Sequence, residues 1–333
     1  MTVFQSEVSI IICAYTLDRW QDICEAIESA RKQDPAPKEI ILVSDYNREL
    51  EERAKAAFPD VVAVSNQEAQ GLSGARNSGI AVARGKVVAF LDDDAIADKH
   101  WTAYLLAECE KSGIVGATAR VEPLWIGQRP RWFPDEFLWV VGCSYRGLPK
   151  QRQEVRNLSG GACGLHRDLS KRSGGFNSLL GRKKGKVPIS CEETEFCIRT
   201  RQILPDAKFV FQPAAVIHHK VPAARLTWSY FTLRCYAEGL SKAYLAKLVG
   251  TGRGLSSERS YVLRTLSSGV LKGLGDAIVH FEVSGLGRSA AIIWGLSCAS
   301  VGYLIGHVRF RPEGPKHAAP PVNVAHLNVE AAD

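Results

Sequence analysis

The sequence lacks the cysteine spacing of a disulfide framework or of a zinc site. Its 9 cysteines are odd in number and widely scattered, and no two of them form a Cys-x-x-Cys pair. No group of cysteines and histidines has the spacing of zinc ligands. We therefore expect free thiols and a location in the reducing cytoplasm.

The sequence also shows no secretion signal and no dense basic block. Residues 1–15 carry no basic segment, and the apolar run at residues 8–12 is too short for the core of a signal peptide. The 42 Lys and Arg residues and the 35 Asp and Glu residues leave a net charge of +7. This mild excess suits an anionic ligand or an anionic membrane surface. Without a basic block, we expect no nucleic-acid partner.

The apolar pattern of the first hundred residues predicts an α/β fold. Four apolar runs predict buried strands, at residues 8–14, 39–44, 61–65 and 86–91. Segments with apolar residues at helical spacing lie between them, at residues 22–32, 49–58 and 73–84. This alternation predicts a mostly parallel sheet flanked by crossover helices. Ligands of such a sheet bind beyond the carboxyl ends of its strands, where Asp45 and Asp92–Asp94 lie.

The C-terminal third is expected to be mostly helical. Helices are predicted over residues 228–249 and 261–281. The uncharged run at residues 289–306 has about the shortest length that crosses a bilayer. Three interpretations of it stay open: a membrane span, a helix buried in the protein, and a helix lying at a membrane interface. The tail at residues 311–333 is expected to be disordered.

Three adjacent carboxylates end the fourth predicted strand. Asp92, Asp93 and Asp94 repel one another there, so packing alone gives no reason to place them together. A hard divalent cation such as Mg²⁺ or Mn²⁺ removes this repulsion and prefers oxygen ligands. A cation held in this way can bridge a diphosphate and stabilise the charge that develops on it as a leaving group. The alternative is a helix N-cap whose acids are solvated.

The segment that leads into these acids resembles the signature of a known enzyme family. Residues 70–94 read QGLSGARNSGIAVARGKVVAFLDDD. They are similar to the Gly-x-x-x-Ala-Arg-Asn-x-Gly helix and the Asp-x-Asp strand end of the inverting family 2 glycosyltransferases, which have the GT-A fold. The matching residues are Gly71, Ala75, Arg76, Asn77, Gly79, Asp92 and Asp94.

Four further segments resemble motifs of this family and occur in its order, so that the likeness covers residues 8–225. Residues 8–16 are similar to its opening strand and turn, and residues 41–47 to its nucleotide-binding turn. Residues 160–176 are similar to its acceptor-side turn with a Gly-Gly-Phe, and residues 191–199 to its base motif. The chain departs from the family at some of these positions. The family usually has proline in place of Cys13 and asparagine in place of Thr16. It usually has aspartate in place of Ser44 and of Glu193.

The resemblance implies a GT-A fold, which is a Rossmann-like α/β fold with a mostly parallel sheet flanked by helices. A C-terminal helical extension would follow it. Residues 1–98 would form the nucleotide-sugar-binding half, and residues 99–225 the acceptor-binding half. Residues 226–310 would form a helical extension open to membrane association, and residues 311–333 the disordered tail.

The resemblance also implies which residues form the site. Those implied to bind the donor nucleotide are Ala14, Tyr15, Asp45, Arg76, Asp92 and Asp93. The metal is implied to be held by Asp94, Asp92 and one of two adjacent histidines, of which His218 is preferred because it comes first after a strand. A pair of histidines that only form hydrogen bonds is the alternative. Residues implied on the acceptor side are Gly160, Gly161, Glu192 and Trp132.

Glu193 is implied to be the base that takes the proton from the acceptor hydroxyl. Crowding by Glu192 and Glu195 is expected to raise its pKa. The alternative is a solvated acidic helix start that the helix dipole stabilises.

One tempting pattern is rejected. Residues 128–132 fit the Gln-x-x-Arg-Trp box of processive polysaccharide synthases, but there the box follows the base motif, and here it precedes Glu193. We expect a coincidence, with the aromatic residues lining a cleft or packing in the core.

Residues 221–243 resemble a stretch found in family 2 enzymes that act on polyprenyl- or dolichyl-linked sugars. Arg234, Glu238 and Lys242 are four residues apart and share a helix face in this stretch. They either form ion pairs along the helix or meet an acceptor phosphate or anionic headgroups.

These observations predict a metal-dependent, inverting glycosyltransferase that uses Mn²⁺ or Mg²⁺. Its donor would be a nucleotide-diphosphate sugar, most often a UDP sugar in this family. Its acceptor would be a hydroxyl of a glycan, a lipid-linked sugar or a small molecule, met in the cytoplasm or at the inner face of the cell membrane. Two alternatives stay open: a degenerate relative that binds nucleotide sugar without turnover, and a sugar nucleotidyltransferase. The latter would need a glycine-rich loop, and residues 13–20 contain no glycine.

Overall fold

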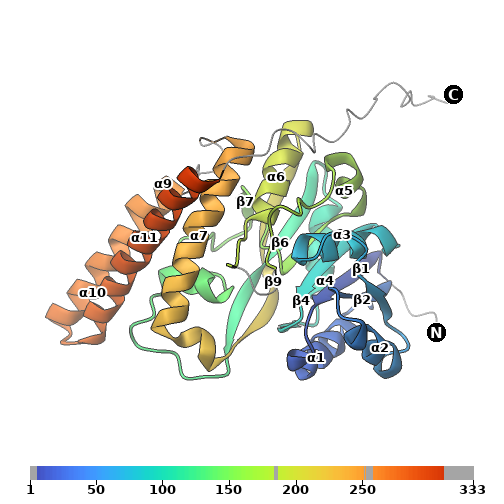
Figure 1. Ribbon diagram of the computed structural model, residues 1–333, viewed down its shortest axis with the longest axis horizontal. Helices are drawn as coiled ribbons and strands as arrows, with labels where there is room; N and C mark the ends of the chain where they lie inside the picture. Colours follow the sequence, from blue (N-terminus) through green and yellow to red (C-terminus); the bar gives the residue numbers. More distant parts are fainter. Residues whose placement is uncertain (1–5, 184–186, 251, 253–257, 311–333) are drawn as a thin grey trace.

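A computed structural model describes residues 6–183, 187–250, 252 and 258–310 (Figure 1). The tail that was expected to be disordered lies outside the described residues. One mixed sheet has the strand order β3-β2-β1-β4-β8-β6-β9-β5, and β7 pairs with β9. The strands are β1 Val8–Ala14, β2 Glu39–Ser44, β3 Val62–Ser65, β4 Val87–Asp92, β5 Ala95–Ala97, β6 Ile114–Trp125, β7 Gln153–Val155, β8 Ala162–His166 and β9 Lys208–Val221.

Helices cover both faces of the sheet and extend beyond it (Figure 1). Their bounds are α1 Trp20–Arg31, α2 Arg48–Ala57, α3 Leu72–Val82, α4 Trp101–Cys109, α5 Arg167–Ser173, α6 Glu192–Ile203, α7 Trp228–Val249, α9 Glu258–Ser260, α10 Ser267–Val279 and α11 Ser284–Arg309. The predicted α/β class, mostly parallel sheet and C-terminal helices are confirmed. All 9 cysteines are free, as their spacing predicted.

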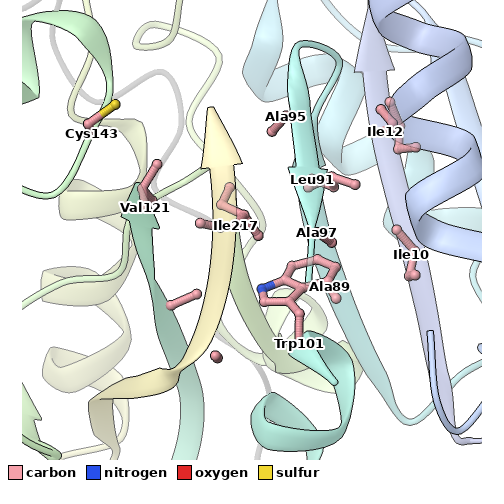
Figure 2. Packing of buried hydrophobic residues seen from close by; sticks show 14 of the residues in the cluster. Ile10, Ile12, Ala89, Leu91, Ala95, Ala97, Trp101, Val121, Cys143 and Ile217 are labelled. Carbon is pink, nitrogen blue, oxygen red and sulfur yellow. The ribbon is translucent and has the colours of Figure 1, made fainter. Parts of the chain in front are cut away.

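The first four strands are parallel, as the alternating pattern predicted. β1 pairs with β2 on one side and with β4 on the other, and β3 lies next to β2. Consecutive residues of β1 face opposite sides of the sheet, and both sides are covered. Ile10 and Ile12 pack in one core, in which Trp101 of α4 is also fully buried (Figure 2), whereas Ile11 packs in the core under α3. The run of apolar residues in β1 therefore reflects burial on both faces.

The second half of the sheet brings distant segments to the end of β4. β8 is antiparallel to β4 and β6, and the long strands β6 and β9 are parallel to each other. The short strand β5 follows β4 and is antiparallel to β9, with Ala95 opposite His219 and Ile96 opposite His218. This pairing places the end of β9 beside the acidic turn after β4.

The C-terminal helices form a separate layer along one side of the sheet (Figure 1). α7 has the bounds that the sequence predicted, and α11 extends beyond the predicted uncharged run at both ends. Gly239 of α7 and Gly302 of α11 allow the two helices to pack closely. A Cβ atom at Gly239 would collide with the carbonyl oxygen of Ala299, and one at Gly302 with that of Tyr236.

Among the residues that the structure describes, α11 is the helix that is long and apolar enough to cross a membrane, and 33% of its apolar window is buried. The rest of that window is partly or fully exposed. This degree of exposure argues against the interpretation that it is simply a core helix.

Candidate active site

Two carboxylates and an imidazole meet at the end of β4. Ligand atoms of Asp92, Asp94 and His219 all lie within 4.8 Å of one another, and we call these three residues the metal group. Nε2 of His219 is 3.1 Å from Oδ1 of Asp94. His218, which the sequence favoured, points to the opposite side of β9, where its Nε2 lies 2.9 Å from Oδ1 of Asp98. This placement corrects the preference for His218, because adjacent residues of a strand face opposite ways.

The metal group has the composition and burial of a divalent cation site. Asp94 and His219 are buried, and Nδ1 of His219 has no hydrogen-bond partner. Two carboxylates and one imidazole suit Mn²⁺. Burial opposes the charged form of Asp94, but His219 and the nearby arginines hold the pKa of this carboxyl below its usual value. Burial raises the pKa of Asp93 to about 8, against the attraction of Arg19. The residues present therefore fit a divalent metal.

Two arginines that the sequence did not single out contact the acidic turn. Nη1 of Arg19 lies 2.8 Å from Asp93 and 3.0 Å from Asp94, and Nη2 of Arg225 lies 2.8 Å from Asp94. The guanidinium of Arg19 also lies over the ring of Tyr15, 5.2 Å from its centroid. Guanidinium groups bind phosphates with paired hydrogen bonds, so these side chains can flank a diphosphate. Arg19 could have been found from its place in the turn after β1.

Asp45 organises the loop expected to hold the nucleotide. Its backbone N–H donates to the carbonyl of Ala14 at 2.8 Å. Its carboxylate accepts a hydrogen bond from Asn66 at 2.7 Å and from the backbone N–H of Gly71 at 3.0 Å. Tyr15, at the end of β1, is 39% exposed and open to a ligand. A carboxylate accepts up to about four hydrogen bonds, so Asp45 retains capacity for a further one from a ligand.

Two adjacent glycines bring the two sides of the site together. A Cβ atom at Gly160 would lie 2.6 Å from a nitrogen of the Arg76 guanidinium, and one at Gly161 would collide with the carboxylate of Asp92. The carbonyl of Gly161 also accepts a hydrogen bond from the backbone N–H of Asp92 at 3.3 Å. The turn at residues 160–161 therefore packs against both the carboxylate of Asp92 and the guanidinium of Arg76.

Arg76 forms a buried ion pair with Glu192. Its Nη1 lies 2.9 Å from Oε1 of Glu192, and the two side chains are 3% and 5% exposed. The guanidinium also lies about equally far from the rings of Phe90 and Phe176, at 5.5 and 5.4 Å. Glu192 is thus the partner of an arginine that was expected at the nucleotide. The pair fixes the start of α6 against α3.

Glu193 follows this ion pair and is partly buried. Burial is the largest cause that raises the pKa of Glu193, to about 8; the Glu192 charge raises it further, and Arg76 opposes both. Oε2 of Glu193 has no hydrogen-bond partner. Glu195, which was also expected to crowd Glu193, instead pairs with Arg199 at 2.7 Å. The raised pKa is confirmed, but burial is its main cause, and the interpretation as a solvated helix start is wrong.

Trp132 and the charged face of α7, which the sequence also singled out, make contacts within the protein. Trp132 lies edge-on to Trp228, with ring centroids 4.5 Å apart, and 5.6 Å from Phe231, so it packs against α7. On the face of α7, Nζ of Lys242 lies 3.5 Å from Glu238. The predicted ion-pair ladder is thus confirmed for Glu238 and Lys242.

Comparisons with known proteins agree with these motifs. The chain matches the model of the family described as glycosyl transferase family 2 over residues 9–174. It is 32% identical over 240 residues to the glucosyl-dolichyl phosphate glucuronosyltransferase of Haloferax volcanii, which covers 71% of this chain and 76% of that protein. It is 24% identical over 271 residues to the succinoglycan biosynthesis protein ExoM of Rhizobium meliloti, which covers 79% of this chain and 82% of that protein.

A solved structure confirms the fold. The chain resembles a mannosyltransferase from Pyrobaculum calidifontis, in complex with GDP-Man and Mn²⁺, with a TM-score of 0.56 and 15% identity. The likeness covers 90% of this chain and 88% of that one. At this identity, the comparison supports the architecture of sheet and helices.

Proposed function

Since the chain belongs to glycosyl transferase family 2, we propose that this glycosyltransferase moves a sugar from a nucleotide-diphosphate sugar to a hydroxyl acceptor with inversion of the anomeric carbon. The turn at Gly160–Gly161 carries this proposal. Gly161 packs against Asp92 of the metal group, and Gly160 packs against Arg76. Arg76 in turn pairs with Glu192, the residue before Glu193. A donor bound at the metal group and an acceptor bound at Glu193 would therefore meet across this turn. Family membership excludes the nucleotidyltransferase alternative.

The donor would bind along the carboxyl ends of β1, β2 and β4. Asp45 accepts a hydrogen bond from the base of a UDP sugar, with Ala14 and Tyr15 beside it, and Asp92 or Asp93 holds the ribose. The diphosphate meets the guanidinium groups of Arg19 and Arg225, which already lie at the acidic turn. Asp92, Asp94 and His219 would hold Mn²⁺ or Mg²⁺, which supplies positive charge for the leaving diphosphate.

Glu193 would supply the base for the transfer. Its carboxylate takes the proton of the acceptor hydroxyl as the oxygen forms a bond to the anomeric carbon. The bond between that carbon and the diphosphate oxygen breaks in the same step, and the nucleoside diphosphate leaves. Attack opposite the leaving group inverts the configuration. Burial of Glu193 supports this role, because it raises the pKa into the range useful to a base.

The experiment that tests this function is transfer from a panel of nucleotide sugars to a lipid-linked glucosyl phosphate, with the product examined by NMR. We expect one donor to be used in the presence of Mn²⁺ or Mg²⁺. An α-linked donor should give a β-linked product. A product with the donor's own configuration would contradict direct displacement by the acceptor.

We also propose that the acceptor is lipid-linked and that the C-terminal helices rest on the cytoplasmic face of a membrane. The relative from Haloferax volcanii is named for a dolichyl phosphate substrate. The end of α10 and the turn that leads to α11 expose large apolar side chains: Ile278 is 73% exposed, Val279 67%, Phe281 86% and Val283 78%. Exposed large apolar side chains that lie this near one another in the chain are typical of a site that meets a partner or a lipid surface.

Replacing Phe281 and Val283 with serine is expected to weaken binding to vesicles about tenfold or more, because two large apolar side chains no longer enter the bilayer. Cosedimentation with phosphatidylglycerol and phosphatidylethanolamine vesicles measures this. Ile126→Ser is the matched control, since Ile126 is 62% exposed in another part of the chain. Equal sedimentation of the double variant and the wild type would rule out the turn as the membrane contact.

A further inference from the structure

Arg234 of α7 differs from the other buried cations in the described part of the chain. The exposed fractions of Arg76, Lys220 and Arg234 are 3%, 8% and 4%. Arg76 is paired with Glu192, and Lys220 is paired with two carboxylates. No carboxylate in the described residues lies within ion-pair distance of Arg234. A buried cation without a counter-ion is costly, so this position favours an anion from outside the chain.

The hydrogen bonds of Arg234 are also incomplete. Its Nη1 donates to the carbonyl of Pro188 at 3.1 Å, and its Nε is buried without a partner. Burial and then the nearby Arg182 guanidinium lower the pKa of Arg234. Arg225 acts on it in the same direction. The charges of Arg182 and Arg225 therefore disfavour the charged form of Arg234, and Tyr230 and Glu238 act in the opposite direction.

Arg234 is linked both to the metal group and to the start of α6. The charge of Arg225, which contacts Asp94 of the metal group, acts on Arg234. Glu238 follows Arg234 one helical turn later on α7 and accepts a hydrogen bond from the thiol of Cys191 at 3.8 Å. Cys191 immediately precedes α6, on which Glu193 lies. An anion bound at Arg234 would therefore be close to the base.

We propose that Arg234 binds the phosphate through which an acceptor sugar is attached to its lipid. This inference rests on the proposed function, because it assigns a chemical group to the acceptor of that reaction. The donor diphosphate already has Arg19, Arg225 and the metal group. The acceptor hydroxyl meets Glu193, and in a sugar joined to a lipid through phosphate, the phosphate is one sugar ring away from that hydroxyl. A guanidinium provides paired hydrogen bonds for such a phosphate.

The test compares the binding of farnesyl phosphate and of farnesol, with UDP and Mn²⁺ present so that the donor site is filled. We expect the wild type to bind farnesyl phosphate about 10- to 100-fold more tightly than farnesol, as for a hydrogen-bonded charge. Arg234→Met should remove this preference, and Arg234→Lys should keep part of it. Lys242→Met is the matched control on the same helix, because Lys242 already has carboxylate partners. It should keep the preference.

Three results would overturn the proposal. The first is a wild type with no preference for farnesyl phosphate. The second is an Arg234→Met variant that weakens UDP binding instead, which would assign the arginine to the donor. The third is an Arg234→Met variant that binds farnesyl phosphate and farnesol more weakly by the same factor, while its thermal unfolding matches that of the wild type. Failure of the proposed function looks different, because transfer would then be absent while the phosphate preference of the wild type remained.

Discussion

Replacing Glu193 with glutamine is expected to lower kcat by about 100- to 10,000-fold, the usual contribution of a positioned base. Glutamine has nearly the same shape and no carboxylate, so binding of the nucleotide sugar should be unchanged. Single-turnover transfer and donor titration measure the two effects separately. Glu193→Asp is the conservative control, since it keeps a carboxylate, and it should retain more activity than the glutamine variant. Transfer by Glu193→Gln within about tenfold of the wild type would show that another group is the base.

The pH dependence of Glu193 gives a second readout of the same assignment. Its pKa is raised from 4.5 to about 8, so only the fraction without a proton acts as base below that pH. kcat/KM of the wild type should therefore rise about tenfold per pH unit up to pH of about 8. Between pH 4.5 and about 8 the folded state keeps a proton that the unfolded state has released. Stability should fall as pH rises through this window, and Glu193→Gln should remove that fall.

Replacing Arg76 with methionine is expected to destabilise the fold by about 3–5 kcal/mol, because it leaves Glu192 buried without its cation. The pair joins α3 to the start of α6, so the loss should also disturb the position of Glu193. Urea unfolding measures the change in stability.

The matched variant for Arg76→Met also replaces Glu192 with glutamine, which removes the unpaired charge. We expect the double variant to regain roughly half of the lost stability or more, since the cost comes mainly from the isolated carboxylate. A single variant that loses less than about 1 kcal/mol would mean that the pair is no more important than an exposed one.

Much of this site could be predicted because its residues follow strand ends. Asp45 and Asp92–Asp94 come directly after apolar runs, and parallel strands bring their carboxyl ends to one edge. The roles of Arg76 and Asn77 are predicted from the resemblance of their segment to the family motif. The structure adds why Asn77 suits this place: its side chain amide donates to the carbonyl of Phe176 at 2.9 Å and accepts from the N–H of Phe176 at 2.8 Å.

The rest depended on contacts between distant segments. His219 and His218 differ only in which face of β9 they occupy, and this is set by pairing with β5. The ion pair of Arg76 with Glu192 joins residues 116 apart. The contact of Arg225 with Asp94 depends on the course of the chain after β9. No local pattern in the sequence encodes these approaches.

Calorimetric titration of a donor panel into the protein, with Mn²⁺, with Mg²⁺ and with a chelator, tests the central claim most directly. Asp94→Ala removes a residue of the metal group, and Asp98→Ala is its matched control, because Asp98 pairs with His218 on the other face of β9. We predict that one nucleotide sugar binds only with the cation, that Asp94→Ala loses this binding and that Asp98→Ala keeps it. Binding that is equally strong with the chelator, or that survives in Asp94→Ala, would contradict the account.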